Sequence, residues 1–392
     1  MTMRFLQAMT GALAAGLLFA CLALPARAVP ITPSRDDEVI EVLPATSGNR
    51  SEERQTRKQL AARPDDAPLA LAVARRYLDQ AREFGDPRYA GLALAALRSW
   101  PDAAAAPSDV LLVRATLQQY LHDFDASVAS LRQLLTRPGA ERQSQAWLTL
   151  ATVLRVQGRY ADSDVACGEV ERSGAQLYSA ACLAENAALR GEVGAARQRF
   201  ETLLSDPRLP AGTRAWLLTS LAELEERAGR AAAADAAYRS ALRLGPDGYA
   251  AIAYADFLIA QRRPGEALEL LKDERRTDAV VLRMASAGTQ ARDPGAERDV
   301  AEMRDRIALA NERPDARLFH GREQAMFALH VEHAPERALE LARGDVARQR
   351  EPLDLLVFAQ AARASGQAAA VEEARRLKSS IGLHDRRTDA LL

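Results

Sequence analysis

The chain has 392 residues, with 52 basic and 53 acidic side chains and a formal net charge of −1. Because nucleic-acid binding usually needs a basic surface, this balance argues against a nucleic-acid partner. Aromatic residues make up only 5% of the chain. With so few large side chains, the core is expected to come from closely packed helices rich in Ala and Leu.

The first 28 residues are typical of a Sec signal peptide. Arg4 gives the basic start, an apolar run follows, and Ala26-Arg27-Ala28 is a small-x-small cleavage signal. Cleavage between Ala28 and Val29 would release a periplasmic or secreted protein with no transmembrane span, because the apolar run is short for a bilayer. The alternative is a lipid anchor at Cys21, which the bulky Phe19 and the apolar residues after Cys21 disfavour.

Residues 29–66 are predicted to be a linker followed by an N-terminal capping helix. Pro, Ser and Gly in the first part indicate the linker. Val39, Ile40 and Val42 could alternatively add as a strand to the sheet of a partner. The charged residues 50–62 are expected to form the capping helix.

Helical hairpins are predicted from residue 67 onward. Residues 67–105 indicate a divergent first hairpin, in which Asp86 caps the second helix and Pro87 takes its first position. Residues 108–277 predict five regular units, each with one small residue in the first helix and another twelve positions later. The first small residues are Ala115, Ala151, Ala184, Ala222 and Ala255, and their partners are Ser127, Ser163, Ala196, Ala234 and Ala267.

The last part of the chain is less regular. Residues 278–351 are expected to form irregular helical hairpins, and residues 352–392 a C-terminal hairpin and tail. In this last hairpin Ala359 is the small residue and Gly366 the turn.

The unit is clearest in residues 144–176, with Ala151 at position eight, Gly158 at fifteen, Tyr160 at seventeen and Ser163 at twenty. This spacing resembles the tetratricopeptide repeat, a helix-turn-helix of about 34 residues. The stretches FGDPRYAGLALAAL, HDFDASVASL, QAWLTLATVLRVQGRYADSDVAC, AYADFLIAQRRPGEALELL and QREPLD are similar to secreted bacterial tetratricopeptide proteins of unassigned function. The resemblance implies an all-α, right-handed solenoid of about nine hairpins and an exported chain, and it implies no activity.

In proteins of this resemblance the concave side of the solenoid is the binding groove. An α-helix turns about 100° per residue, which places positions two, five, nine, twelve and thirteen of each first helix on that side. Large amphipathic rings dominate binding energy at interfaces, so Tyr178, Trp216 and Tyr249 are the expected anchors. The predicted groove residues are Thr116, Gln119, Tyr120, Leu148, Thr152, Arg155, Tyr178, Glu185, Trp216, Glu223, Arg227, Tyr249, Ile252 and Asp256.

A protein or peptide partner is predicted, with no cofactor. Repeats of this type that clamp a C-terminal carboxylate typically present Asn and Lys in the groove. Position nine here reads Thr116, Thr152, Glu185, Glu223 and Asp256. The groove becomes acidic in its second half, which favours a basic or mixed-charge peptide.

Cys167 and Cys182 are predicted to form a disulfide. Cys167 lies midway along the second helix of one unit and Cys182 midway along the first helix of the next, at similar distances from the turn near Gly174. The periplasm is oxidising and permits such a bond. The alternative is a pair of small core residues with free thiols.

Catalytic and metal-binding patterns are weak. The sequence has no Ser hydrolase elbow, phosphate-binding loop, zinc-protease helix or EF-hand loop. His330, Glu332 and His333 form the one titratable cluster, and two His ligands without a third do not predict a metal site. The leading interpretation is therefore an exported, non-catalytic binding scaffold.

Two alternatives remain open. The first is an outer-membrane lipoprotein that aids envelope assembly, which requires the lipid at Cys21. The second is a cell-wall glycosidase with a helical superstructure, which the absence of any long break in the helical pattern disfavours.

Overall fold

The computed structural model describes residues 50–139, 143–312 and 321–392. The described residues form 20 helices and no strand. The chain divides into two units, residues 1–54 and 55–392. Of the first unit the structure describes residues 50–54, which begin helix α2 (Arg50–Ala62). The expected signal peptide, with Cys21 and the cleavage point after Ala28, and the strand-like run at Val39 lie outside the described residues.

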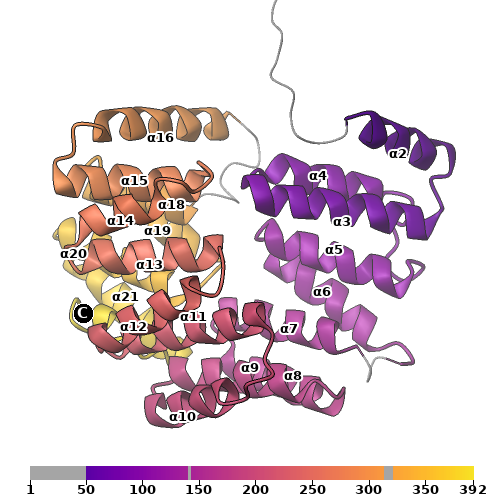
Figure 1. The fold of residues 1–392 in the computed structure, drawn as a ribbon, viewed down its shortest axis with the longest axis horizontal. Helices are drawn as coiled ribbons and strands as arrows, with labels where there is room; N and C mark the ends of the chain where they lie inside the picture. The colour runs from indigo at the N-terminus through magenta and orange to yellow at the C-terminus, as the bar shows by residue number, and fades with distance from the viewer. Residues whose placement is uncertain (1–49, 140–142, 313–320) are drawn as a thin grey trace, which may run out of the picture. The chain divides into compact units, whose positions relative to one another are not determined.

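Eighteen helices pair into nine hairpins that follow one another along the chain (Figure 1). This confirms the predicted all-α solenoid. The pairs are α3 (Ala67–Phe84) with α4 (Pro87–Ala96), α5 (Ser108–Tyr120) with α6 (Phe124–Leu135), α7 (Ser144–Val156) with α8 (Tyr160–Arg172), α9 (Gln176–Leu189) with α10 (Val193–Leu204), α11 (Ala211–Arg227) with α12 (Ala231–Leu242), α13 (Gly248–Ala260) with α14 (Pro264–Leu271), α15 (Asp278–Ala291) with α16 (Ala296–Asn311), α18 (Gly321–His330) with α19 (Pro335–Val346), and α20 (Pro352–Ala364) with α21 (Ala368–Ile381). The short helix α22 (Arg386–Asp389) follows the last pair.

The small residues of the five regular units lie where the two helices of a hairpin touch. All ten are fully buried. Where the second residue is a serine, its hydroxyl donates to the carbonyl of the first: Ser127 Oγ to Ala115 O at 2.9 Å and Ser163 Oγ to Ala151 O at 2.8 Å. The twelve-residue spacing is thus the separation in sequence of the two residues that meet where the helices of a hairpin are closest.

Each hairpin turn contains one residue in the left-handed backbone region, with φ between 54° and 88°. Glycine adopts this conformation without steric cost, whereas other residues adopt it less readily. Five turns use glycine and four use histidine or arginine. The nine residues are Gly85, His122, Gly158, Gly191, Gly229, Arg262, Arg292, His333 and Gly366.

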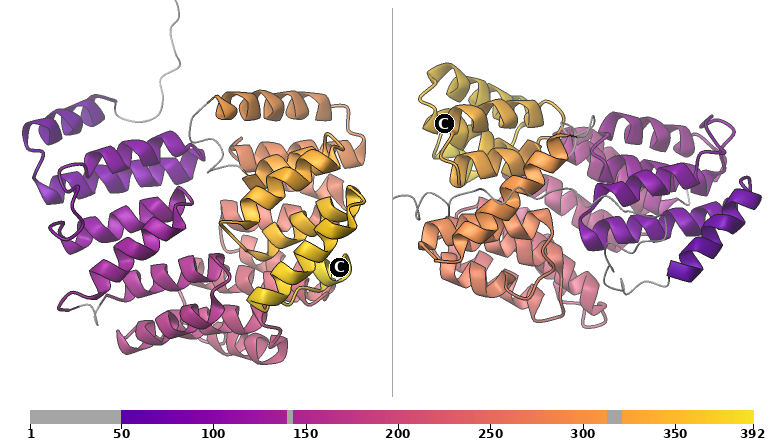
Figure 2. Two further views of the ribbon diagram at one scale, coloured as in Figure 1. Left: turned by 180° about the vertical axis from the view of Figure 1, so that it is seen from behind. Right: turned by 90° about the horizontal axis from the view of Figure 1, so that it is seen from above.

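Within residues 55–392, later segments pack against the turns of the first five hairpins, in a line of contacts that we call the closure seam. In the left view of Figure 2 the C-terminal helices lie in front of the middle hairpins, and backbone hydrogen bonds join the two. Arg350 N donates to Val156 O at 2.6 Å, and His384 N donates to Leu189 O at 2.8 Å. Farther along, Arg387 Nη1 donates to Glu226 Oε1 at 2.5 Å.

Two turn glycines permit this close approach. A Cβ at Gly158 would lie 2.9 Å from Ile381, and one at Gly191 would lie 2.8 Å from His384. Both distances are shorter than ordinary carbon contacts. The turns therefore shape each hairpin and also receive the C-terminal segment.

Candidate functional site on the inner helices

The closure seam divides the predicted groove residues according to their place along each first helix. Every first helix ends at a turn, and the turns of the first five hairpins form the seam. Residues early in a helix therefore lie away from the seam, and residues late in a helix lie near it.

The early positions of the first units form an open pocket. Leu112 of α5, Leu148 of α7 and Tyr178 of α9 line a cavity of about 710 Å³. Tyr178 is 42% exposed, and the centroid of its ring lies 5.9 Å from that of Trp216 on α11. We call Leu112, Leu148, Tyr178 and Trp216 the aromatic strip. Leu148, Tyr178 and Trp216 belong to the predicted groove, and the structure brings them together.

Several other predicted groove residues are engaged within the chain. The hydroxyls of Thr116 and Thr152 donate to carbonyls of their own helices, each at 2.9 Å. Tyr120 Oη donates to Ala81 O at 2.7 Å, while Gln119 is half-buried beside it on α5. These residues lie outside the open pocket.

Arg155 and Glu185 form an ion pair between α7 and α9. Ser220 Oγ of α11 also donates to Glu185 Oε1, at 2.8 Å. Both charged groups therefore link neighbouring hairpins.

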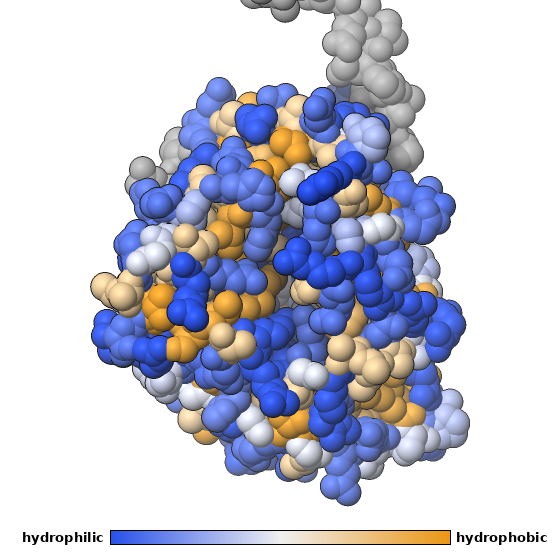
Figure 3. Space-filling model, turned by 90° about the vertical axis from the view of Figure 1, so that its left-hand side faces the viewer, coloured by the Kyte–Doolittle hydropathy of each residue, from blue (hydrophilic) through white to orange (hydrophobic). Residues whose placement is uncertain are grey.

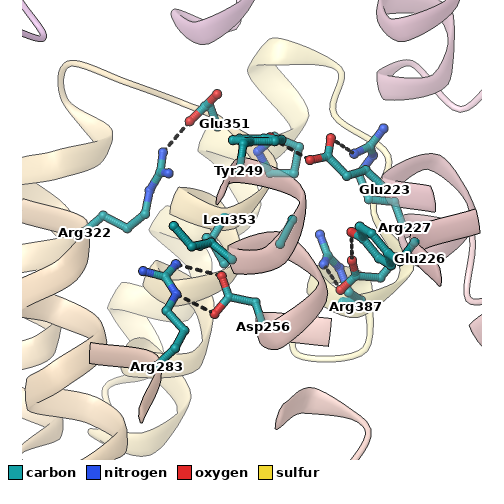
Figure 4. Close-up of a pocket in the computed structure, with 14 residues that line it drawn as sticks. Glu223, Glu226, Arg227, Tyr249, Asp256, Arg283, Arg322, Glu351, Leu353 and Arg387 are labelled. Atoms are coloured by element: carbon teal, nitrogen blue, oxygen red, sulfur yellow. Dashed lines mark hydrogen bonds and ion pairs between the residues drawn. The ribbon is translucent and has the colours of Figure 1, made fainter. Parts of the chain in front are cut away.

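The last five predicted groove residues line a second cavity of about 160 Å³, which we call the charged pocket (Figure 4). They are Glu223 and Arg227 of α11, with Tyr249, Ile252 and Asp256 of α13. The other lining residues were not predicted: Glu226, Tyr238, Ala253, Arg283, Arg322, Glu351, Pro352, Leu353 and Arg387. Most of these come from α15, α18 and the C-terminal segments, and not from the helices α11 and α13 that carry the predicted residues.

Arginines of the same chain pair with the acidic groups of the charged pocket. Arg283 donates to both oxygens of Asp256, at 2.9 and 2.7 Å (Figure 4). Arg387 pairs with Glu226, and Arg322 pairs with Glu351. Asp256, Glu226 and Glu351 are thus each paired with an arginine from another helix or segment of the chain.

Tyr249 and Glu223 form a hydrogen bond at the edge of the charged pocket. Tyr249 Oη donates to Glu223 Oε1 at 2.6 Å, although the tyrosine as a whole is 66% exposed. Burial raises the pKa of Glu223, and the Glu223 carboxylate raises the pKa of the Tyr249 hydroxyl well above its usual value. The phenol therefore stays protonated as a donor at neutral pH.

Two buried carboxyl groups lie behind Arg322. Gln349 Nε2 donates to Asp345 Oδ2 at 3.4 Å and to Asp354 Oδ1 at 3.1 Å. Burial and the neighbouring Asp354 carboxylate raise the pKa of Asp345 to about 8. The folded chain therefore holds a proton that the unfolded chain releases near pH 4.

We expect the stability of the chain to fall as pH rises from about 4 to about 8, because the folded state binds the extra proton across that window. Asp345→Asn should flatten this dependence, measured as the urea midpoint at several pH values. Asp305→Asn, at an exposed carboxyl of α16, is the control and should keep the wild-type slope. An unchanged slope in Asp345→Asn would show that Asp345 is not the group that titrates.

The predicted disulfide is present. Cys167 of α8 and Cys182 of α9 are bonded, with Cα atoms 5.9 Å apart, and both residues are buried. Asn186 of α9 donates to Ser163 Oγ and to Asp164 Oδ1, each at 2.9 Å, next to the bond. The disulfide and these hydrogen bonds fasten the third hairpin to the fourth.

Neither a membrane-spanning helix nor a metal cluster occurs in the described parts of the chain. No helix there is both long and apolar enough to cross a bilayer. Those residues also include no group of three or more His, Cys, Asp or Glu side chains arranged to hold a metal ion. Glu332, from the cluster singled out in the sequence, pairs with Arg337 at 2.9 Å.

No family model matches the chain, and no curated protein matches it. Among solved structures it is similar to a tetratricopeptide repeat protein from Parabacteroides merdae, with 14% identity over 69% of this chain and 98% of that one and a TM-score of 0.35. It is also similar to a Rap protein complexed with Competence and Sporulation Factor, with 11% identity over 88% of this chain and 93% of that one and a TM-score of 0.45. A third similar structure is the tetratricopeptide repeat domain of P58(IPK), with 15% identity over 81% of this chain and 96% of that one and a TM-score of 0.24.

These identities and TM-scores are low, so the fold assignment rests on the hairpins of the chain itself. Nine successive helix pairs, a left-handed residue in each turn and buried small residues twelve apart are the features of that repeat. By these features the chain folds as an α-solenoid of tetratricopeptide-like hairpins.

Proposed function

We propose that the chain is an exported, non-catalytic scaffold that binds a protein or peptide at the aromatic strip. The observation that carries the proposal is the Tyr178 ring, exposed at the edge of an open pocket of about 710 Å³ and in contact with Trp216. Exposed aromatic rings beside a concave surface are typical anchors of interfaces. Export rests on residues 1–28, whose pattern is that of a signal peptide.

The open pocket favours a partner with an apolar side chain and a neighbouring basic one. Leu112, Leu148, Val170 and Tyr178 supply apolar surface, and Asp109 is the charged residue of the lining. The charged pocket is less suited to a basic partner, because its acidic groups are already paired with arginines. The preference for basic or mixed charge therefore comes from Asp109.

We expect Tyr178→Ala combined with Trp216→Ala to weaken partner binding by about 700-fold, since anchor rings commonly contribute about 2 kcal/mol or more each. Partners are first captured from periplasmic extract with a photo-crosslinker next to the strip, and affinity is then measured with the purified partner. Val165→Ala is the control, because Val165 is 68% exposed on α8 and does not line the pocket.

Equal affinity of the double variant and the wild type would contradict binding at the aromatic strip. Circular dichroism of each variant checks that the helices are intact. Loss of binding in Val165→Ala as well would place the partner on a different surface.

A further inference from the structure

The closure seam has one end that differs from the rest, where the first hairpin meets the connection between α14 and α15. Arg275 Nη2 donates to Glu83 Oε1 at 2.9 Å, and the Arg275 guanidinium lies 4.8 Å from the centre of the Phe84 ring. Thr277 packs over Gly85, where an added Cβ would come within 3.0 Å of it. We call these five residues the clasp.

The clasp joins residues 192 positions apart with side chains that remain in water. The side chains of Glu83 and Arg275 are 57% and 54% exposed, and Phe84 is 36% exposed. Solvent screens an exposed ion pair, and a cation above an exposed ring adds only modest stabilisation. The clasp is therefore a weak closure.

The opposite end of the seam is buried. Leu383, Asp385 and Thr388 are each no more than 2% exposed. Asp385 caps α22 and pairs with Arg387, which in turn pairs with Glu226. This end is built like a protein core, and its separation would expose apolar surface and buried charge.

We infer that the solenoid opens at the clasp while the rest of the seam stays closed. In the open form the first hairpin separates from the α14–α15 connection, and the ends of the inner helices that meet there become accessible. The clasp is then a gate to the inner helix surfaces. This inference goes beyond partner binding and holds whatever partner the aromatic strip takes.

Exposed apolar side chains of the described residues are spread over several hairpins. The face in Figure 3 is mostly hydrophilic, with apolar side chains in separate groups. Val165 and Leu309 are each 68% exposed but lie on different hairpins, α8 and α16. Neither side chain indicates which partner would cover it.

The gate is tested with spin labels at Arg82→Cys and Asp273→Cys, two exposed positions beside the clasp. Pulsed electron paramagnetic resonance measures the distances between the two labels. Cys21 is replaced by Ser, so that the remaining native cysteines are those of the disulfide. The labelled chain should show a major short distance and a minor long one. Adding Arg275→Ala should raise the ratio of long to short distances about tenfold, because both attractive contacts of Arg275 are lost.

Arg343→Ala is the matched control. Arg343 also makes an exposed ion pair, with Glu373 at 2.9 Å, and lies over a ring, 6.0 Å from the centre of Phe358, but it does not contact the clasp. Its distance distribution should equal that of the wild type. Phe84→Ala is a second opening variant and should act in the same direction as Arg275→Ala.

Identical distributions for the wild type, Arg275→Ala and Phe84→Ala would overturn the gate. An equal shift in Arg343→Ala would also overturn it, since the solenoid would then be loosening as a whole. Added salt gives a further check, because it screens the ion pair between Glu83 and Arg275. The fraction of molecules at the long distance should therefore rise with salt in the wild type and not in Arg275→Ala.

Discussion

Arg322→Ala is expected to destabilise the chain by about 3–5 kcal/mol, the usual cost of leaving a buried charge without its partner. Arg322 of α18 pairs with both Asp354 and Glu351 at the start of α20. The side chain of Asp354 has no exposed surface. Without the guanidinium, Asp354 must either stay charged in the interior or take up a proton.

Urea denaturation followed by circular dichroism measures this loss. Arg322→Ala combined with Asp354→Asn should recover much of it, because the neutral amide removes the buried charge while its oxygen can still accept the hydrogen bond from Glu351 N. Arg343→Ala, which breaks an exposed ion pair, should cost about 1 kcal/mol or less. A loss below about 1 kcal/mol in Arg322→Ala would mean that Asp354 does not depend on Arg322 for its charge.

The repeat register predicts positions within a hairpin but not contacts between distant segments. The register gives the position of a residue within its own hairpin, and on that basis it correctly placed the buried small residues of all five regular units. It does not give the point at which the solenoid returns on itself. That point depends on small rotations summed over many repeats, so Arg387, which pairs with Glu226 from 161 positions away, was missed.

In the irregular hairpins the twelve-residue spacing of small residues is broken by local changes in the turn or in the point of helix contact. In α18 and α19 the buried alanines Ala325 and Ala338 are thirteen residues apart, because the turn at His333 has one extra residue: Ala334 N donates to Ala328 O, six positions back. In the regular turns the corresponding bond spans five positions, as from Arg159 N to Leu154 O. The helices were predicted, but the spacing that defines the register was not.

In α15 and α16 the close contact has moved along the helices. A Cβ at Gly288 would lie 2.9 Å from the Cβ of Ala296, so Gly288 and Ala296 form the point of approach. Glu297, twelve residues after the buried Ala285, is exposed. A search for small residues twelve apart therefore fails here although the hairpin forms.

The candidate site divides in the same way. The sequence placed Leu148, Tyr178 and Trp216 on one surface, because each lies early in its own helix and neighbouring helices stack in register. The late positions, such as Arg155 and Arg227, were predicted to face an open groove, but each now pairs with a carboxylate of the chain. Their availability to a partner stays a prediction that binding measurements must test.

Removal of the disulfide by Cys167→Ala combined with Cys182→Ala should destabilise the chain by about 3 kcal/mol, the chain-entropy value for a loop of this length. The bond closes 15 residues across the junction of α8 and α9. Its loss should act mainly on the third and fourth hairpins, because hairpins of a solenoid depend on their nearest neighbours.

Urea denaturation with and without dithiothreitol measures the effect, and hydrogen exchange of α8 and α9 locates it. The wild type should lose stability on reduction, whereas the double variant should not respond to the reductant. Asn186 and Ser179 should still link the two hairpins through Ser163, Asp164 and the Cys167 carbonyl, so the helices remain paired. Free thiols in the oxidised wild type, detected by alkylation and mass spectrometry, would contradict the bond itself, and equal midpoints with and without reductant would contradict its role in stability.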